Sequence, residues 1–172
     1  MSAVLVVQPL VLAPMTVADL HQVMAIETQA YAFPWTRGNL VDSLAAGYLA
    51  QMLQDAGGEV LGYYVAMPGV DELHLLNLTV APAWQGRGHG WRLLAAVEAA
   101  ALQHGLGTLW LEVRAGNERA QQMYRKRGFV ASGIRRGYYP APGLLREDAV
   151  VMCLPAQALA RGDDQGSGLG AG

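Results

Sequence analysis

The sequence predicts one globular domain of the mixed α/β class, and three observations lead to this expectation. The chain has 172 residues, an ordinary length for a single domain. Hydrophobic residues make up 52% of it and charged residues 15%, a balance that supports a packed core and argues against disorder. Short β-prone runs and amphipathic helical segments are interspersed, in the order β-α-α-β-β-β-α-β-α-β-β.

The first quarter of the chain is expected to hold one strand and two helices. An apolar, β-prone run over residues 4–14 predicts the first strand. Thr16, followed three residues later by Asp19, is an acidic variant of the capping box and predicts a helix start. Pro34 disfavours helix at the preceding residue, so the helix ends before Phe-Pro-Trp and a short second helix covers about 36–46.

The middle of the chain is expected to be mainly strand. Two β-prone runs, 48–54 and 60–67, flank the sequence Asp-Ala-Gly-Gly-Glu and predict a hairpin. A third run, 73–80, is ended by Ala-Pro. A glycine-rich turn then leads into an amphipathic helix that runs to about residue 104, where Gly105 supplies a C-terminal cap.

The last third completes the pattern. A strand is expected over 108–113, then a helix that Asn117 caps and that ends near Gly128. Residues 129–135 and 148–154 are expected to form a final pair of strands.

Composition also bears on domain limits and compartment. Residues 161–172 are rich in Gly, Ser and Asp, so we expect a disordered tail after one domain over 1–160. The start is a poor signal peptide and no stretch reaches 18 apolar residues, so we expect no membrane span. The single cysteine, Cys153, favours the reducing cytoplasm and is expected to be buried in its strand. The histidines show no metal-ligand spacing and are expected to be structural: His21, His74, His89 and His104.

Charge is unevenly distributed along the chain. Residues 1–80 contain seven acids and one base, whereas residues 81–160 contain ten bases and five acids. A basic half suits a phosphate-bearing ligand, and an acidic half suits a cationic substrate. The excess is too small and too dispersed to favour nucleic acid. A solvated surface of uneven charge is an equally good interpretation.

The segment Gln85-Gly-Arg-Gly-His-Gly90 connects a predicted strand to a helix. Backbone N–H groups at a helix start suit a pyrophosphate, and Gly88 and Gly90 let it approach the backbone closely. Arg87 and Arg92 add positive charge. The spacing Gly-x-Gly-x-Gly, late in the chain, differs from the dinucleotide-binding fingerprint. Such a segment is also often only a turn.

Several motifs of this chain resemble one enzyme family. Gln85-x-x-Gly88-x-Gly90 resembles the acetyl-CoA pyrophosphate motif of the GCN5-related N-acetyltransferases, the GNAT family. Residues 109–117, 120–124 and Gly128-Phe129 resemble the second half of that fold. Segments containing Phe-Pro-Trp, Tyr-Tyr-Pro and Arg-Glu-Asp-Ala-Val-Val-Met resemble its RimI-like subfamily of ribosomal-protein-alanine N-acetyltransferases. The resemblance spans about residues 8–155.

The resemblance implies a fold and a reaction. It implies a three-layer α/β/α fold with a central, mostly antiparallel sheet. It implies direct transfer of an acetyl group from acetyl-CoA, without a metal, to the N-terminal alanine of a small-subunit ribosomal protein. Neither nucleic acid nor a membrane is an expected partner. Two alternatives stay open: a GNAT enzyme that acetylates lysine side chains or a small-molecule amine, and a non-catalytic CoA- or partner-binding module.

Glu112 matches the position of the family's general base. Strand alternation groups it with Trp110 and Arg114 on one face. An α-amine has a pKa of about 7.7–8.0, so at pH 7 it is mostly protonated and a base must take its proton. The other interpretation of Glu112 is a surface carboxylate, or one in a salt bridge with Arg114.

Tyr124 matches the family's general acid, because a phenol with a pKa of about 10 stays protonated and can protonate a leaving thiolate. Its alternative role is packing on an amphipathic helix. Asn117 matches a CoA-contacting position and is equally a helix N-cap. We expect His89 to be exposed and non-catalytic. The remaining cosubstrate contacts that the resemblance implies are Leu78, Thr79, Val80, Gln85, Gly86, Arg87, Gly88, His89, Gly90 and Trp91.

A terminal amine suits a single carboxylate base better than a lysine amine does. The pKa of lysine, about 10.4, lies roughly 2.5 units higher, so neutralising it costs about 3.4 kcal/mol more. The acidic N-terminal half would attract a basic peptide. The candidates for the rim of a substrate site, each with core packing as the alternative, are Phe33, Trp35, Tyr138 and Tyr139.

Overall fold

The computed structural model describes residues 9–159. The first part of the strand expected over 4–14, and the expected tail over 161–172, therefore lie outside the described residues. The chain divides into two compact units. The first contains the described residues up to Val65 together with Asn77–Leu93, and the second contains Ala66–Leu76 together with the described residues from Leu94 onward.

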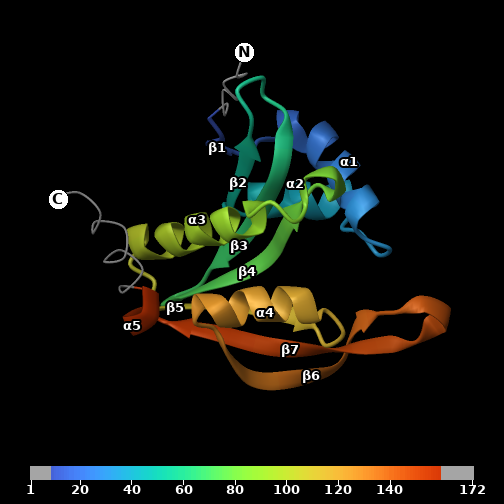
Figure 1. Cartoon of the computed structure of the whole chain (residues 1–172), viewed down its shortest axis with the longest axis vertical. Coiled ribbons are helices and arrows are strands. Elements are labelled where there is room, and N and C mark those ends of the chain that lie inside the picture. Colours follow the sequence, from blue (N-terminus) through green and yellow to red (C-terminus); the bar gives the residue numbers. More distant parts are fainter. Residues whose placement is uncertain (1–8, 160–172) are drawn as a thin grey trace, which may run out of the picture. The chain divides into compact units, whose positions relative to one another are not determined.

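The mixed α/β class is confirmed by the helices and strands (Figure 1). The seven strands follow the order β1-β2-β3-β4-β5-β7-β6 in the sheet. The strands are β1 (Val11–Pro14), β2 (Leu49–Gln54), β3 (Val60–Pro68), β4 (Glu72–Val80), β5 (Thr108–Arg114), β6 (Val130–Pro140) and β7 (Arg146–Pro155). The α-helices are α1 (Leu20–Ala30), α2 (Arg37–Ala45), α3 (His89–Gln103), α4 (Glu118–Arg127) and α5 (Ala156–Leu159), and short 3-10 turns cover Val17–Asp19, Pro82–Trp84 and Pro142–Leu144.

Strand pairing is mixed. β4 and β5 are parallel, and their ladder runs from Glu72–Thr108 to Leu75–Leu111. β1 pairs with β2 antiparallel, and β7 pairs antiparallel with both β5 and β6. The parallel register places His74 opposite Trp110, and the ladder ends one residue before Glu112.

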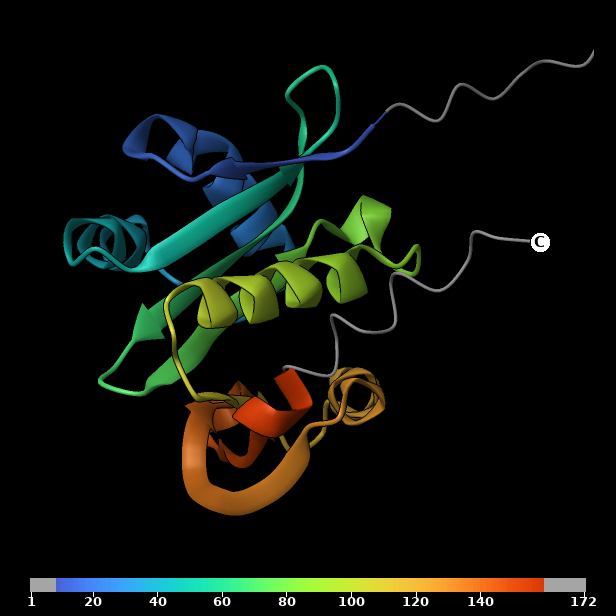
Figure 2. The ribbon, with the colours of Figure 1, turned by 90° about the vertical axis from the view of Figure 1, so that its left-hand side faces the viewer.

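The first unit has its own apolar core. Its fully buried side chains come from the two helices and from the strands, and each stabilises the fold by about 1.5–3 kcal/mol. The predicted capping interaction is present, since the Thr16 amide donates to the Asp19 carboxylate at 2.8 Å, although the first turn is 3-10 before α1 begins. Figure 2 shows β1 beside β2 and the turn that joins β2 to β3.

The hairpin of β6 and β7 is longer than the sequence predicts. Strand pairing continues to Pro140 and Arg146, beyond the expected 129–135 and 148–154. The register shifts twice along β6, which is strongly curved (Figure 2). At the second shift Gly137 has a φ of +57° and its amide donates to the Asp148 carboxylate at 2.8 Å. A side chain thus replaces the missing ladder bond and lets the strand continue.

The described residues contain no helix that is both long and apolar enough to cross a membrane.

Candidate active site

In the first unit, the glycine-rich turn has the backbone that its composition suggests. Gly86 and Gly88 have φ values of +78° and +83°, a region that residues with a side chain rarely adopt. A Cβ atom on Gly88 would meet nothing within 4 Å, so the glycine is needed here for its backbone conformation and leaves the turn open. α3 begins at His89, so Gly90 lies in the first helical turn. The turn therefore presents a helix start, as an anion site requires.

The expectation that His89 is exposed is wrong. The residue is half-buried, and its ring lies 6.3 Å from that of Trp84 in an edge-on arrangement. The Arg87 guanidinium lies over the same Trp84 ring at 4.9 Å. Burial, then the charges of Arg87 and Arg92, lowers the pKa of His89. The positive charge of this turn at neutral pH therefore comes from its arginines.

The last residues of β4 lie beside a polar network that the sequence did not indicate. The Tyr31 hydroxyl lies 2.7 Å from the Thr79 hydroxyl and 3.4 Å from the Leu78 carbonyl. The Gln85 side chain donates to the Val80 carbonyl at 3.1 Å, which ties the turn to the strand that precedes it.

Glu27 is the centre of this network. It is 1% exposed and accepts hydrogen bonds from the Trp35 amide at 3.0 Å, from the Asn77 side chain at 3.2 Å and from the Tyr63 hydroxyl. A buried carboxylate without partners would cost several kcal/mol, so three donors are what this position requires. Burial, then the charge of Glu27, raises the pKa of Tyr63. The helical stripe of α1 gave no signal for Glu27, because only the tertiary fold brings its partners together.

The two rim candidates of the first unit differ in exposure. Phe33 is 43% exposed, whereas Trp35 is half-buried and packs against the apolar core of this unit. Core packing is thus the observed role of Trp35, and Phe33 remains available to a ligand.

In the second unit, β5 shows the predicted alternation. Leu109, Leu111 and Val113 are buried residues on one face, and Trp110, Glu112 and Arg114 alternate onto the other face, whose residues are less completely buried. Glu112 is therefore on the face that the sequence assigned to it.

Glu112 is engaged by two side chains from other strands. His74 Nε2 lies 2.5 Å from Glu112 Oε2, and Arg135 Nε lies 3.4 Å from Glu112 Oε1. The Glu112 side chain is 6% exposed. The suggested salt bridge between Glu112 and Arg114 is wrong, because Arg114 instead pairs with Glu147 at 3.1 Å.

His74 is the functional candidate that sequence reasoning missed. Its ring is stacked on Trp110, with the ring centroids 3.6 Å apart and the planes 9° from parallel. Its spacing along the chain gave no signal, because the neighbours lie 36 and 38 positions away. Only the parallel register between β4 and β5 places His74 beside Glu112.

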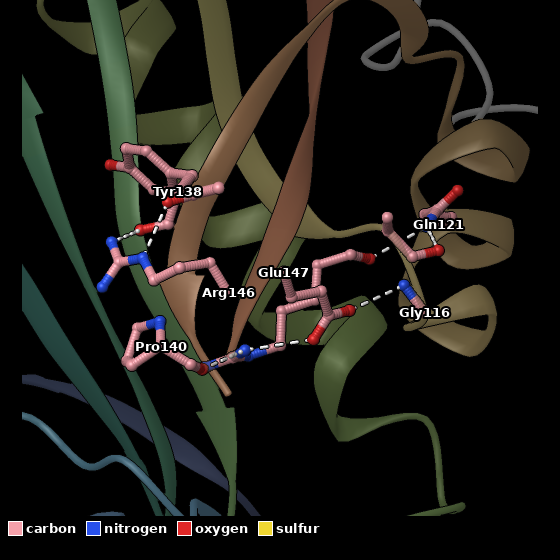
Figure 3. Close-up of polar contacts among 9 residues, drawn as sticks. Gly116, Gln121, Tyr138, Pro140, Arg146 and Glu147 are labelled. Carbon is pink, nitrogen blue, oxygen red and sulfur yellow. Dashed lines mark hydrogen bonds and ion pairs between the residues drawn. The ribbon is translucent and has the colours of Figure 1, made fainter. Parts of the chain in front are cut away.

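Glu147 holds the start of β7 against the turn between β5 and α4. Its two carboxylate oxygens accept from Arg114 Nη1 at 3.1 Å and from the Gly116 amide at 2.9 Å (Figure 3). The same Arg114 nitrogen donates to the Pro140 carbonyl at 3.0 Å, and the guanidinium lies 4.5 Å over the Tyr139 ring. Through Glu147 on β7 and the Pro140 carbonyl on β6, both strands of the hairpin are thus connected to Arg114.

The two hairpin tyrosines form one aromatic group. Tyr138 and Tyr139 meet edge to face with ring centroids 4.9 Å apart, and Arg135 lies 5.6 Å over Tyr138. Tyr138 is 40% exposed and Tyr139 half-buried. Burial, then the charge of Glu112, raises the pKa of both phenols, so they are uncharged at neutral pH.

The start of α4 is capped as expected. The Asn117 side chain accepts from the Ala120 amide at 3.2 Å. Tyr124 lies on the same helix, is 8% exposed, and its ring centroid lies 5.5 Å from that of Phe129. The packing role, which was the alternative interpretation of Tyr124, is observed.

Cys153 is only half-buried, contrary to expectation, with its Sγ 3.3 Å from the Ser132 hydroxyl. It alternates onto the Trp110 face of the sheet and not onto the core face. Among residues 9–159, no three His, Cys, Asp or Glu side chains are grouped so as to hold a metal ion.

Comparison with known proteins identifies relatives over most of the chain. The profile of the Acetyltransferase (GNAT) family matches residues 20–129. A protein of Haemophilus ducreyi named [ribosomal protein bS18]-alanine N-acetyltransferase is 37% identical over 136 residues, which are 79% of this chain and 93% of the relative. The Escherichia coli K12 protein of the same name is 37% identical over 137 residues, covering 80% and 91% of the two chains.

Solved structures agree on the fold. The crystal structure of the ribosomal-protein-S18-alanine N-acetyltransferase from Escherichia coli has a TM-score of 0.80 at 34% identity, covering 86% of this chain and 94% of that one. A spermidine/spermine N-acetyltransferase SpeG from Vibrio cholerae has a TM-score of 0.76 at only 16% identity, covering 90% and 98%. The fold alone therefore does not select the amine that is acetylated.

Proposed function

The chain belongs to the Acetyltransferase (GNAT) family and is an acetyl-CoA-dependent N-acetyltransferase, and from this premise we propose that it acetylates the N-terminal alanine of ribosomal protein bS18. The observation that carries the proposal is the match to relatives of that name at 37% identity over about four fifths of the chain. The same relatives are matched over more than nine tenths of their own length.

The proposed cosubstrate contacts lie in the first unit, apart from Asn117. The turn from Gln85 to Trp91 would take the pyrophosphate of acetyl-CoA on backbone N–H groups, with Arg87 supplying charge. The backbone of Leu78, Thr79 and Val80 would pair with the pantetheine arm, which carries amide groups. Two of those carbonyls already accept from side chains, so their orientation is fixed before a ligand binds.

The proposed chemistry has two proton transfers. The amine nitrogen forms a bond to the thioester carbonyl carbon, and the C–S bond breaks with the electron pair on the CoA sulfur. Glu112, a carboxylate, would act as the base that removes a proton from the amine. Tyr124 would give a proton to the thiolate, because a phenol is protonated at the pH of the reaction, and the second proton that the nitrogen loses on becoming an amide would restore the phenol.

The exposed aromatic side chains are the proposed peptide contacts. Phe33 and Tyr138 are 43% and 40% exposed, so both rings can be reached by a ligand. Uncharged phenols beside the Arg135 guanidinium offer a surface for peptide backbone and small side chains. Tyr139 remains a candidate beside Tyr138 in the second unit, and in the first unit we no longer include Trp35, which packs in the core.

A matched pair of peptides tests the choice of amine. One begins with a free Ala followed by a basic stretch, and the other has the same sequence with a blocked N-terminus and an internal Lys. We expect acetyl-CoA to label only the free-Ala peptide by mass spectrometry. Labelling of the blocked peptide would identify a lysine acetyltransferase. If neither peptide is labelled but spermidine, supplied in a separate reaction, is acetylated, the protein is a small-amine enzyme. Acetyl-CoA binding without any transfer would identify a non-catalytic module.

A further inference from the structure

The proposed base does not stand alone. Each oxygen of the Glu112 carboxylate already faces a donor, His74 Nε2 on one side and Arg135 Nε on the other. The hydrogen between Oε2 and Nε2 must come from the imidazole whenever the carboxylate is ionised. In that state the neutral imidazole keeps its lone pair on Nδ1.

Nδ1 of His74 is available. Within the described part of the chain it accepts from no side chain or amide, since the interactions of His74 are those with Glu112 and Trp110. It is also not sealed in the core, because the described residues include no fully buried side-chain nitrogen or oxygen that lacks a partner. The basic atom of this cluster that faces no donor is therefore Nδ1 of the imidazole, because each oxygen of the carboxylate already faces one.

The surroundings favour a fixed imidazole. The stacked Trp110 ring prevents rotation out of the plane, and the bond to Glu112 sets which nitrogen points away. The charged and titratable groups near the pair are Arg135, Tyr138 and Tyr139 of β6. The phenols are uncharged at neutral pH, so Glu112 is the anion that would stabilise an imidazolium.

We propose that His74 and Glu112 form a catalytic dyad in which His74 Nδ1 takes the proton of the substrate amine and Glu112 stabilises the resulting imidazolium through Nε2–H. The proton leaves the ammonium nitrogen and arrives on Nδ1, directly or through one water. It is released to solvent after the acetyl group has moved to the amine. This inference rests on the proposed function for its reaction, and it reassigns the basic atom within the same cluster.

The chemistry of the two groups supports the dyad. An imidazole ordinarily has a pKa of about 6.5 and a carboxyl group of glutamate about 4.3, against about 7.8 for a terminal amine. Transfer to an imidazole is thus unfavourable by only about 20-fold, whereas transfer to a carboxylate is unfavourable by about 3000-fold. A base closer in strength to the amine is the more effective one near neutral pH.

The variant His74→Gln distinguishes a catalytic role of the imidazole from a purely structural role of His74. Its amide nitrogen takes the place of Nε2 and still donates to Glu112, but it offers no basic nitrogen in place of Nδ1. We expect kcat to fall about 100-fold or more with the KM for acetyl-CoA unchanged. His104→Gln, at an exposed position near the end of α3, is the matched control and should keep wild-type rates.

A second readout does not depend on turnover. Nitrogen-15 NMR of the wild-type protein at pH 7.5 should show His74 with hydrogen on Nε2 and none on Nδ1. Retention of kcat in His74→Gln to within about threefold, or an Nδ1–H tautomer, would overturn the dyad. The kinetic test uses whichever amine the wild type acetylates, because every ammonium must lose a proton. Activity on lysine alone would thus refute the proposed function while leaving the dyad to be decided by His74→Gln.

Discussion

Glu112 is held from two strands, by His74 of β4 and Arg135 of β6. A carboxylate with a side-chain exposure of 6% keeps one orientation in this arrangement, as a catalytic group requires. Two donors also make Glu112 part of the fold of the second unit, so its replacement affects both rate and stability.

The variant Glu112→Gln tests the carboxylate directly. We expect kcat to fall by about 10²–10⁴-fold, because an amide neither accepts the amine proton nor stabilises an imidazolium. Loss of the ion pairs should lower the free energy of unfolding by about 1–3 kcal/mol. Steady-state kinetics and urea unfolding measure the two effects. Calorimetry should find acetyl-CoA affinity within threefold of wild type, and a fully active variant would exclude Glu112 from the chemistry.

The family resemblance pointed to Glu112 as the candidate base, but neither it nor the residue pattern indicated the partners of Glu112. The β alternation of Trp110 and Glu112 is visible in the sequence, since every second residue shares a face. The contact with His74 depends on how β4 lies against β5, and no local pattern specifies that register. The same holds for Glu27, whose donors come from the loop before α2 and from two strands.

At the scale of elements, the hairpin of β6 and β7 positions the exposed tyrosines. Glu147 joins the hairpin to the β5–α4 turn through Arg114 and the Gly116 amide. Arg114 in turn covers the Tyr139 ring. These contacts fix the position of the hairpin, and with it that of Tyr139, relative to the β5–α4 turn.

The variant Glu147→Ala removes that connection. We expect the KM for an Ala-terminated peptide to rise about 5–20-fold while kcat changes less, because the tyrosines are displaced and the Glu112 cluster is not. The loss of two half-exposed hydrogen bonds should cost about 1–2 kcal/mol of unfolding free energy. Kinetics with varied peptide concentration provide the measurement, and Glu118→Ala, at an exposed site on α4, is the control. An unchanged KM would show that the hairpin does not contact substrate.

The positions of most helices and strands could be predicted from the sequence, whereas the length of the β6–β7 hairpin could not. Gly, Pro and capping residues set most boundaries: the structure has a strand over Leu49–Gln54 and a helix over Arg37–Ala45, close to the expected limits. The hairpin extends to Pro140 because Asp148 supplies an acceptor for the amide of Gly137. That compensation comes from the opposite strand, so local propensity could not reveal it.

At the scale of the whole molecule, buried phenols couple stability to alkaline pH. Burial raises the pKa of Tyr64, which is 1% exposed, to about 12. The unfolded chain ionises this group near pH 10, so the folded state binds one proton more between pH 10 and 12. Stability is therefore complete below pH 10 and is lost as the pH rises through this window, by about 2–3 kcal/mol.

Urea unfolding at pH 9, 10 and 11 tests this dependence. The variant Tyr64→Phe should show a shallower decline than wild type above pH 10, although it starts about 1 kcal/mol less stable because the hydrogen bond to Gln51 is lost. Parallel curves for the two proteins would show that Tyr64 does not contribute.

The family assignment rests on similarity over most of the chain. The GNAT profile and the named relatives cover the turn, the Glu112 strand and α4 together, so the family assignment does not depend on any one motif. The resemblance seen in the sequence pointed to the same family because its motifs are contiguous segments, which can be recognised without knowledge of the tertiary structure. The amine that is acetylated is set by tertiary surfaces, and it needs a direct experiment.

The most direct test is to incubate the purified protein with isotopically labelled acetyl-CoA and intact, unacetylated bS18 that begins with Ala. Peptide mapping by mass spectrometry then locates every label. We expect one acetyl group, on the α-amine of the N-terminal alanine, and labelling at least about 100-fold slower after Glu112→Gln. Labels on lysine side chains with a free N-terminus, or no label on bS18 while another amine is acetylated, would contradict it.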